Sequence, residues 1–191
     1  MKHKIIAISR QFGSGGRTIG KEVAEKLGIA CYDQELINML AEKSGFSQSR
    51  VAELNEESSR HTLLPGVADR VERSLQYTLW QKQREVILEL AEKESCVIVG
   101  RCADFVLRDR DDVLRVYIHA DKMKRAERIV NVYGEREDAP LKRIADKDKS
   151  RKSYYESITS KRWGDADNYH IALDSGELGI ETCVRLLCEL F

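Results

Sequence analysis

Residues 6–20 read IAISRQFGSGGRTIG, and the sequence on either side shows what these glycines connect. The apolar run Lys4–Ser9 predicts a short buried strand. Residues Thr18–Leu27 carry apolar side chains at helical spacing and stop at Gly28, a common C-terminal end of a helix. A glycine-rich turn therefore joins a strand to a helix, and the unpaired N–H groups at the start of such a helix favour an anion.

The same turn is similar to the phosphate-binding loop G-x-x-x-x-G-K-[ST], whose glycines let the backbone curl around phosphate oxygens. Gly16 and Thr18 match the second glycine and the hydroxyl residue, whereas Gln11 replaces the first glycine and Arg17 replaces the lysine. Arg17 keeps a positive charge for the outer donor phosphates, and the Thr18 hydroxyl suits Mg²⁺. The predicted phosphate-binding residues are Gly13, Ser14, Gly15, Gly16, Arg17 and Thr18. A turn without a ligand remains the alternative.

Apolar periodicity along the rest of the chain alternates between strands and helices. Further strands are predicted at Ile29–Tyr32, Cys96–Val99, Val113–His119 and Tyr169–Leu173. Helices are predicted at Gln34–Lys43, from Ser47 to about Glu56, and at Val67–Glu94, Ala120–Val132, Pro140–Lys161 and Ile180–Leu190. This alternation favours an α/β fold with a parallel sheet and helices on both faces. A loop is predicted at Ser58–Gly66, and the strand-free segments 45–94 and 134–162 are interpreted as helical insertions on the sheet core.

The charge balance limits the classes of partner. The chain has 191 residues, of which 42% are hydrophobic and 34% charged, so it can bury a core. Lys plus Arg and Asp plus Glu both number 32, so the formal net charge is 0. We therefore expect no nucleic-acid partner and no membrane partner, and any anion site must be local. Arg125 and Arg128 are expected on a solvated face of their helix.

The sequence carries no sign of membrane insertion or of disulfide bonds. No stretch approaches the roughly 20 apolar residues that span a bilayer, and the N-terminal apolar run is too short for a signal peptide. The 5 cysteines form no C-x-x-C pair, so reduced thiols in a cytoplasmic protein are expected and a zinc site is not. The apolar stripe of Val67–Glu94 either packs on the sheet or pairs with a second copy, which leaves a homodimer open.

Three blocks of sequence stand out by their order and spacing. The first is Ile6–Gly20, followed by Cys31–Ile37; the second is Val97–Phe105; the third is Asp146–Tyr155. In this order they cover nearly the whole chain. Together they resemble the cytidylate kinase-like family, within the P-loop nucleoside monophosphate kinases.

This resemblance implies both a fold and a function. The fold is expected to be a three-layer P-loop NTPase fold, with a five-stranded parallel sheet flanked by helices, in a single domain over residues 1–191. A helical acceptor-binding insertion at about residues 34–94 and a lid at about residues 134–162 complete it. The implied activity is ATP-dependent phosphoryl transfer to a small acceptor, first of all a nucleoside monophosphate such as CMP, with ATP and Mg²⁺ at the glycine loop.

The second block departs from authentic cytidylate kinases, where it reads Asp-Gly-Arg-Asp and its arginine and second aspartate hold the pyrimidine nucleotide. Arg101 matches that arginine, but Val99 and Cys102 replace the two aspartates, and Asp104 substitutes only if the turn is reshaped. Arg101 follows a buried strand, at the edge where open α/β sheets bind ligands, so it is expected to orient the acceptor. Asp33 reaches the same edge, either to bind acceptor groups or Mg²⁺ through water, or as an ordinary helix cap.

The third block carries the family's Asp-x-x-Arg signature at Asp148 and Arg151. Arg143, Lys147 and Arg151 stand four residues apart and form one cationic stripe on a helix. On a lid this stripe closes over the transferring phosphate, with Asp148 orienting the Arg151 guanidinium. The predicted catalytic residues are Arg17, Arg151 and Asp148, and the predicted acceptor-binding residues are Asp33, Arg101, Asp104, Arg143 and Lys147. A solvated helix laced with ion pairs is the alternative.

Two other functions compete with a nucleotide kinase. One is a nucleotide-binding regulatory protein with weak or no kinase activity, which the departures at Gln11, Arg17, Val99 and Cys102 motivate. The other is a small-molecule kinase with a non-nucleotide acceptor such as an alcohol. An alcohol needs a base, and Asp33 or Asp104 is the candidate.

Overall fold

The computed structural model of the chain describes residues 3–51, 67–134 and 139–191, with residues 67–73 described by their backbone only. Within these residues lies a five-stranded sheet, made of β1 (Ile5–Arg10), β2 (Ala30–Tyr32), β3 (Cys96–Val99), β4 (Val113–His119) and β5 (Ile171–Asp174). The strands pair in parallel in the order β2-β3-β1-β4-β5. The predicted parallel sheet is confirmed, and each strand lies close to its predicted bounds.

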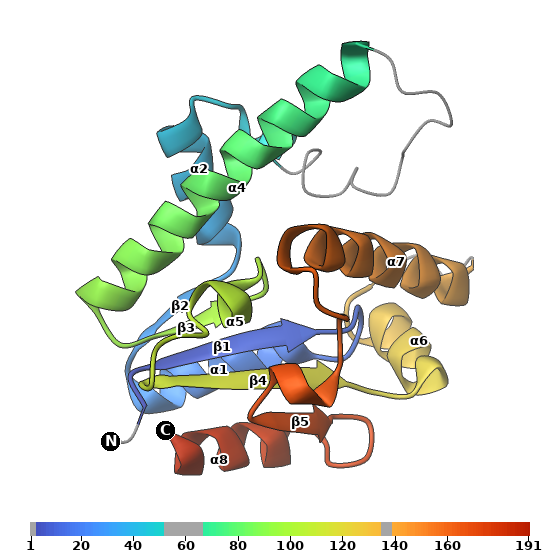
Figure 1. The fold of residues 1–191 in the computed structure, drawn as a ribbon. Helices are drawn as coiled ribbons and strands as arrows, with labels where there is room; N and C mark the ends of the chain where they lie inside the picture. The colour runs from blue at the N-terminus through green and yellow to red at the C-terminus, as the bar shows by residue number, and fades with distance from the viewer. Residues whose placement is uncertain (1–2, 52–66, 135–138) are drawn as a thin grey trace.

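Helices cover both faces of this sheet (Figure 1). They are α1 (Gly16–Leu27), α2 (Gln34–Ser44), α4 (Val67–Lys93), α5 (Ala103–Val106), α6 (Lys122–Asn131), α7 (Pro140–Thr159) and α8 (Ile180–Leu190). Because side chains alternate along a strand, β1 contributes to two cores. Ile5 and Ala7 pack with α2, α4 and α5 on one face, and Ile6 and Ile8 pack with α1 and α8 on the other. The predicted three-layer architecture is therefore confirmed.

Helix α4 forms part of the core layer. Its residues Leu79, Val86, Ile87 and Leu90 are buried in the same cluster as Ile5 of the central strand. The apolar stripe of this helix thus finds its packing surface within the same chain, and a homodimer stays a prediction. The predicted acceptor-binding insertion at residues 34–94 accordingly also supplies one layer of the sheet core.

Local caps explain where several helices begin and end. Gly28 closes α1 with a φ of +66° and donates its N–H to the backbone oxygen of Glu25 (3.2 Å). The Ser47 hydroxyl accepts the N–H of Arg50 (3.2 Å) where helical residues resume, as predicted. The rest of that helix and the predicted loop Ser58–Gly66 lie outside the described residues. A short 3₁₀ helix at Ala166–Asn168 precedes β5 and was not predicted.

The carboxyl ends of the strands point to one edge, and the candidate site residues gather there. β1 lies between β3 and β4, and ligands bind outside the carboxyl ends of such sheets where the strand order reverses. Helices α6 and α7 lie near the arrowheads of β1 and β4, and α6 is the one closer to the turn that follows β5 (Figure 1). Among the helices that the structure describes, none is both long and apolar enough to cross a membrane.

Candidate active site

The glycine loop leaves the first turn of α1 open to an anion. Gly13 and Gly15 adopt φ angles of 76° and 80°, which glycine reaches without strain. Gly15 is the N-cap residue, and the described first turn of α1 has neither a side-chain cap nor an acidic residue. The N–H groups and the positive dipole end of α1 are therefore available to phosphate. The N–H of Ser14 is different, because it points to the backbone oxygen of Gln11 (3.4 Å).

Two arginines of α6 hold the outside of this loop. The Arg125 side chain is only 2% exposed, and it donates to the backbone oxygens of Phe12 (3.0 Å) and Ala120 (2.9 Å). Arg128 donates to the backbone oxygen of Gly13 (3.1 Å). The expected solvated face is wrong for both residues, because α6 packs against the loop and guanidinium groups replace water at its carbonyls.

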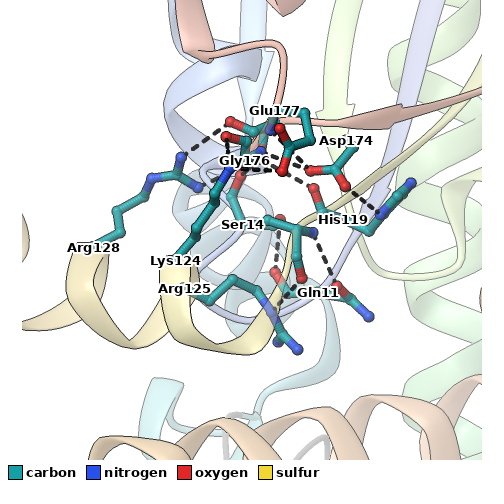
Figure 2. Close-up of polar contacts among 11 residues, drawn as sticks. Gln11, Ser14, His119, Lys124, Arg125, Arg128, Asp174, Gly176 and Glu177 are labelled. Atoms are coloured by element: carbon teal, nitrogen blue, oxygen red, sulfur yellow. Dashed lines mark hydrogen bonds and ion pairs between the residues drawn. The ribbon is translucent and has the colours of Figure 1, made fainter.

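Gln11 and Ser14 tie the loop to the ends of β4 and β5 (Figure 2). The Oε1 atom of Gln11 accepts the N–H of Ala120 (3.2 Å), and the Ser14 hydroxyl donates to the backbone oxygen of Gln11 (2.9 Å). The Ser175 hydroxyl donates to the backbone oxygen of Ser14, and Arg128 donates to the backbone oxygen of Ser175 (3.2 Å). Gln11 therefore replaces a glycine with a side chain that fastens the loop to the neighbouring strand end.

The turn after β5 is folded against α6 (Figure 2). The Asp174 carboxylate accepts the N–H groups of Gly176 (2.8 Å) and Glu177 (3.2 Å). Lys124 donates to the backbone oxygen of Gly176 (2.9 Å) and to the Glu177 carboxylate (2.7 Å). These contacts position Ser175 next to the glycine loop. Sequence reasoning missed this turn, because Lys124 and Gly176 are 52 residues apart and no local pattern links them.

A cavity of about 700 Å³ opens between the glycine loop, the turns after β2 and β3, and α7. The predicted site residues in its lining are Gly13, Gly15, Gly16, Arg17, Thr18, Asp33, Arg101, Lys147 and Arg151. The remaining predicted residues, Ser14, Asp104, Arg143 and Asp148, do not line it. Segments far apart in the sequence therefore meet in one cavity.

The charge of this cavity is strongly one-sided. Its described lining contains the cations Arg10, Arg17, Arg101, Lys147 and Arg151, and the one carboxylate Asp33. The whole chain has a net charge of 0, so the fold concentrates positive charge here. Arg10 was not among the predicted site residues, because it lies one residue before the start of the glycine motif.

Asp33 is engaged by arginines. Its Oδ2 atom contacts Nε of Arg17, and its Oδ1 atom lies 4.0 Å from Nη2 of Arg10. Asp33 occupies the N-cap position of α2 but makes no side-chain cap, so the structure does not bear out the helix-cap alternative. The Arg17 side chain is 57% exposed, which leaves it room to turn from Asp33 toward a ligand.

Asp148 fastens α7 to the glycine loop. Its carboxylate accepts the N–H of Phe12 (2.7 Å) and a hydrogen bond from Arg125 (2.6 Å). Asp148 was expected to orient Arg151. Arg151 donates to the backbone oxygen of Arg10 (3.2 Å), and its guanidinium lies 5.4 Å from the centre of the Phe12 ring. The cationic stripe thus reaches the cavity through Lys147 and Arg151.

The turn after β3 determines which residues of the second block face the cavity. Gly100, Arg101 and Cys102 all have positive φ angles, of 79°, 57° and 54°. The side-chain amide of Gln83, on α4, donates to the backbone oxygen of Arg101 (2.8 Å) and supports this unusual backbone. As a result, Arg101 and Cys102 line the cavity. No sequence signal singled out Gln83.

Asp104 lies behind this turn, in α5. It is 4% exposed, and its carboxylate accepts a hydrogen bond from the Tyr155 hydroxyl (2.7 Å). Burial raises the pKa of Asp104, with the Tyr155 hydrogen bond acting in the opposite direction. The expectation that Asp104 binds the acceptor does not fit this position, because the turn sends its side chain into the protein.

The amino-acid sequence matches the model of one known protein family. A sequence model described as "Cytidylate kinase-like family" matches residues 5–177, from the central strand to the turn after β5. The chain belongs to the cytidylate kinase-like family. The resemblance seen in the three sequence blocks is thereby confirmed.

Two curated relatives of this cytidylate kinase-like protein match nearly over their full lengths. A cytidylate kinase of Archaeoglobus fulgidus is 30% identical over 191 residues, covering 96% of this chain and 92% of the relative. A cytidylate kinase of Pyrobaculum calidifontis is 26% identical over 183 residues, covering 95% of this chain and 89% of the relative. These relatives support a kinase.

Solved structures confirm the fold of this cytidylate kinase-like chain. An uncharacterized protein from Eubacterium ventriosum has a TM-score of 0.72 at 29% identity, covering 97% of this chain and 96% of that one. A shikimate kinase from Bacteroides thetaiotaomicron has a TM-score of 0.56 at 21% identity, covering 97% of each chain. The second likeness concerns the P-loop kinase fold alone.

Thr18 is the candidate Mg²⁺ ligand of this family member. Its hydroxyl borders the cavity in the first turn of α1 and lies 3.3 Å from the Tyr133 hydroxyl. In the described part of the chain, no group of three His, Cys, Asp or Glu side chains is placed to hold a metal ion. Mg²⁺ in kinases keeps several waters and shares substrate phosphates with one or two protein oxygens, so a lone hydroxyl beside a phosphate site fits it.

Gly15→Ala is expected to lower the free energy of unfolding by about 1.5–3 kcal/mol and to weaken ATP binding. The new Cβ would collide with Cδ1 of Ile180, at a φ of +80° that alanine tolerates poorly. Gly28→Ala is the matched control, because Gly28 has a φ of +66° and nothing within 4 Å of the new Cβ. The Gly28→Ala variant is expected to lower the free energy of unfolding by about 1 kcal/mol, through backbone strain alone. Urea unfolding and ATP-dependent thermal shifts measure both; equal losses in the two variants would contradict the packing argument.

Proposed function

We propose that this chain is an ATP-dependent kinase that transfers the γ-phosphate to a nucleoside monophosphate, with CMP as the first acceptor to test. The observation that carries the proposal is the cavity, where the open N-terminus of α1 faces cations from three other segments. Phosphoryl transfer needs alignment and positive charge rather than covalent help from the protein. The names of the two archaeal relatives supply the acceptor class.

On the donor side, the N–H groups of Gly15, Gly16 and Arg17 bind the phosphates of ATP at the helix start. Ser14 keeps its N–H for the loop itself, where it points to Gln11. Arg17 turns away from Asp33 and neutralises the outer phosphates. Thr18 would be one of the ligands of Mg²⁺. Mg²⁺ supplies further positive charge to the phosphates when it is bound with ATP.

On the acceptor side, Arg101 and Asp33 orient the monophosphate, while Lys147 and Arg151 of α7 cover the transferring group. An ionised phosphate acceptor needs no general base. An alcohol acceptor would need one, and Asp104 is poorly placed for this role because it is buried against Tyr155. The arrangement therefore favours a phosphate acceptor over an alcohol.

The test is a coupled assay with ATP, Mg²⁺ and a panel of CMP, dCMP, UMP and AMP, with ATP-dependent melting measured in parallel. The proposal predicts ADP release that depends on at least one of these acceptors. Melting that rises with ATP, together with no turnover across the panel at high enzyme concentration, would instead support the nucleotide-binding regulatory protein. A reaction that appears only with an added alcohol substrate would support the small-molecule kinase.

A further inference from the structure

Arg10 lines the cavity, and the proposed function assigns it no task. It is the last residue of the central strand β1, and its side chain is 21% exposed. Its backbone oxygen accepts the hydrogen bond from Arg151 (3.2 Å), and its side chain lines the same cavity as Arg17 and Arg101. A long cationic side chain thus stands between the donor loop and the turn after β3.

Two glycines make room for this side chain. A Cβ on Gly16 would lie 2.7 Å from Cβ of Arg10, and a Cβ on Gly100 would collide with Nη1 of Arg10. Gly16 belongs to the first turn of α1, and Gly100 begins the turn that carries Arg101. The guanidinium of Arg10 is therefore held against the backbone of the β3 turn, on the Asp33 side of the loop.

The charges around Arg10 leave it short of a negative partner. Among the described residues, Arg10 forms its ion pair with Asp33 at 4.0 Å, and that carboxylate also contacts Arg17. The like charges near Arg10 come from Arg151, Arg101 and Arg17, and burial together with Arg151 lowers its pKa. A confined guanidinium with three cationic neighbours is most stable when an anion joins them.

The position of Arg10 indicates which anion this is. The turn after β5 and the arginines of α6 lie on one side of the glycine loop, around Gly13 and Ser175. Arg10 lies on the other side, with Gly100 and Asp33. The proposed acceptor-binding residues Asp33 and Arg101 lie on this second side, so the anion expected beside Arg10 belongs to the acceptor.

We propose that Arg10 binds the phosphate group of the acceptor, and that Gly100 lacks a side chain so that the Arg10 guanidinium can occupy this place. The inference rests on the proposed function and names a phosphate monoester as the group recognised there. The planar guanidinium offers two parallel N–H donors to a phosphate, which a lysine cannot reproduce.

Arg10→Gln is expected to raise the KM for CMP about 10-fold to 100-fold and to change the KM for ATP less than threefold. Arg10→Lys is expected to recover part of the loss, because it restores charge without the planar fork. Arg185→Gln is the matched control: this arginine on α8 is 60% exposed and pairs with Glu189. A rise confined to the KM for ATP, or no change in either KM, would overturn the inference.

Gly100→Ala tests the same claim without touching Arg10, because the new Cβ takes the place of Nη1. It should reproduce the rise in the KM for CMP, provided circular dichroism and thermal melting show that the variant folds. Unchanged CMP kinetics in a folded Gly100→Ala variant would count against Arg10.

Equilibrium binding separates this inference from the proposed function. Titration calorimetry without ATP measures the affinity of the wild type and Arg10→Gln for CMP and for inorganic phosphate. If the wild type binds these anions and Arg10→Gln binds them at least tenfold more weakly, the inference stands even if no transfer is detected. Wild-type protein that binds neither anion would overturn it, whatever the kinase assay shows.

Discussion

Arg17→Ala is expected to reduce kcat/KM for phosphoryl transfer by about a thousandfold while leaving the fold intact. Arg17 stands where a phosphate-binding loop carries its lysine, so its loss removes positive charge from the phosphates as they separate. The side chain is 57% exposed and its ion pair is with Asp33, so the free energy of unfolding should change by less than about 1 kcal/mol. Steady-state kinetics and urea unfolding of the same preparations measure the two effects.

Arg17→Lys and Arg185→Ala complete this experiment. The lysine variant restores the charge, and we expect it to recover most of the lost rate. Arg185→Ala removes an exposed arginine on α8 whose ion pair is with Glu189, and it should keep wild-type kinetics. Full turnover in Arg17→Ala would remove this residue from the catalytic set.

Arg125→Met is expected to lower the free energy of unfolding by about 3–5 kcal/mol. The Arg125 side chain is 2% exposed and pairs with Asp148, which is 17% exposed. The variant leaves that carboxylate and the backbone oxygens of Phe12 and Ala120 without their guanidinium. Removing one member of a buried ion pair costs more than the pair itself contributes, because the other member stays buried and charged.

A double-mutant cycle with Asp148→Asn measures this coupling. Asparagine keeps an oxygen that can accept the N–H of Phe12, but it has no charge that would be left without a partner. The loss of stability in the double variant should therefore be about 1–3 kcal/mol smaller than the sum of the losses in the two single variants. Arg185→Met is the exposed control and should change stability by no more than about 0.5 kcal/mol. Strictly additive losses would show that Arg125 and Asp148 act independently.

The same pair of residues shows where sequence reasoning stopped. Arg125 and Asp148 are 23 residues apart, on two different helices. On each helix the charged residues have the spacing of a solvated face, and nothing local distinguishes the buried arginine from its neighbours. Asp148 was connected with Arg151 because they are close in sequence, whereas the fold connects it with Arg125 and Phe12.

Asp104 was assigned to the site but is buried, whereas Arg10 was not assigned to the site but lines the cavity. Asp104 was considered for the acceptor site because it lies two residues beyond Cys102, but consecutive positive φ angles turn the chain and bury it. Arg10 received no role because it lies just before the glycine motif, yet the strand end and two glycines place it in the cavity. In both cases the decisive information is the direction of the backbone at a strand end.

The order of the strands and of the longer helices, the parallel sheet and the open N-terminus of α1 follow from the sequence alone, because apolar periodicity and glycine conformations act between residues close along the chain. The tertiary structure decided which of many arginines face the cavity, which one is buried, and which carboxylates they meet. Those choices depend on contacts between segments more than a hundred residues apart, such as Arg125 with Phe12 and Arg151 with Arg10. A charged side chain is equally compatible with water and with a buried partner until packing brings that partner within a hydrogen bond.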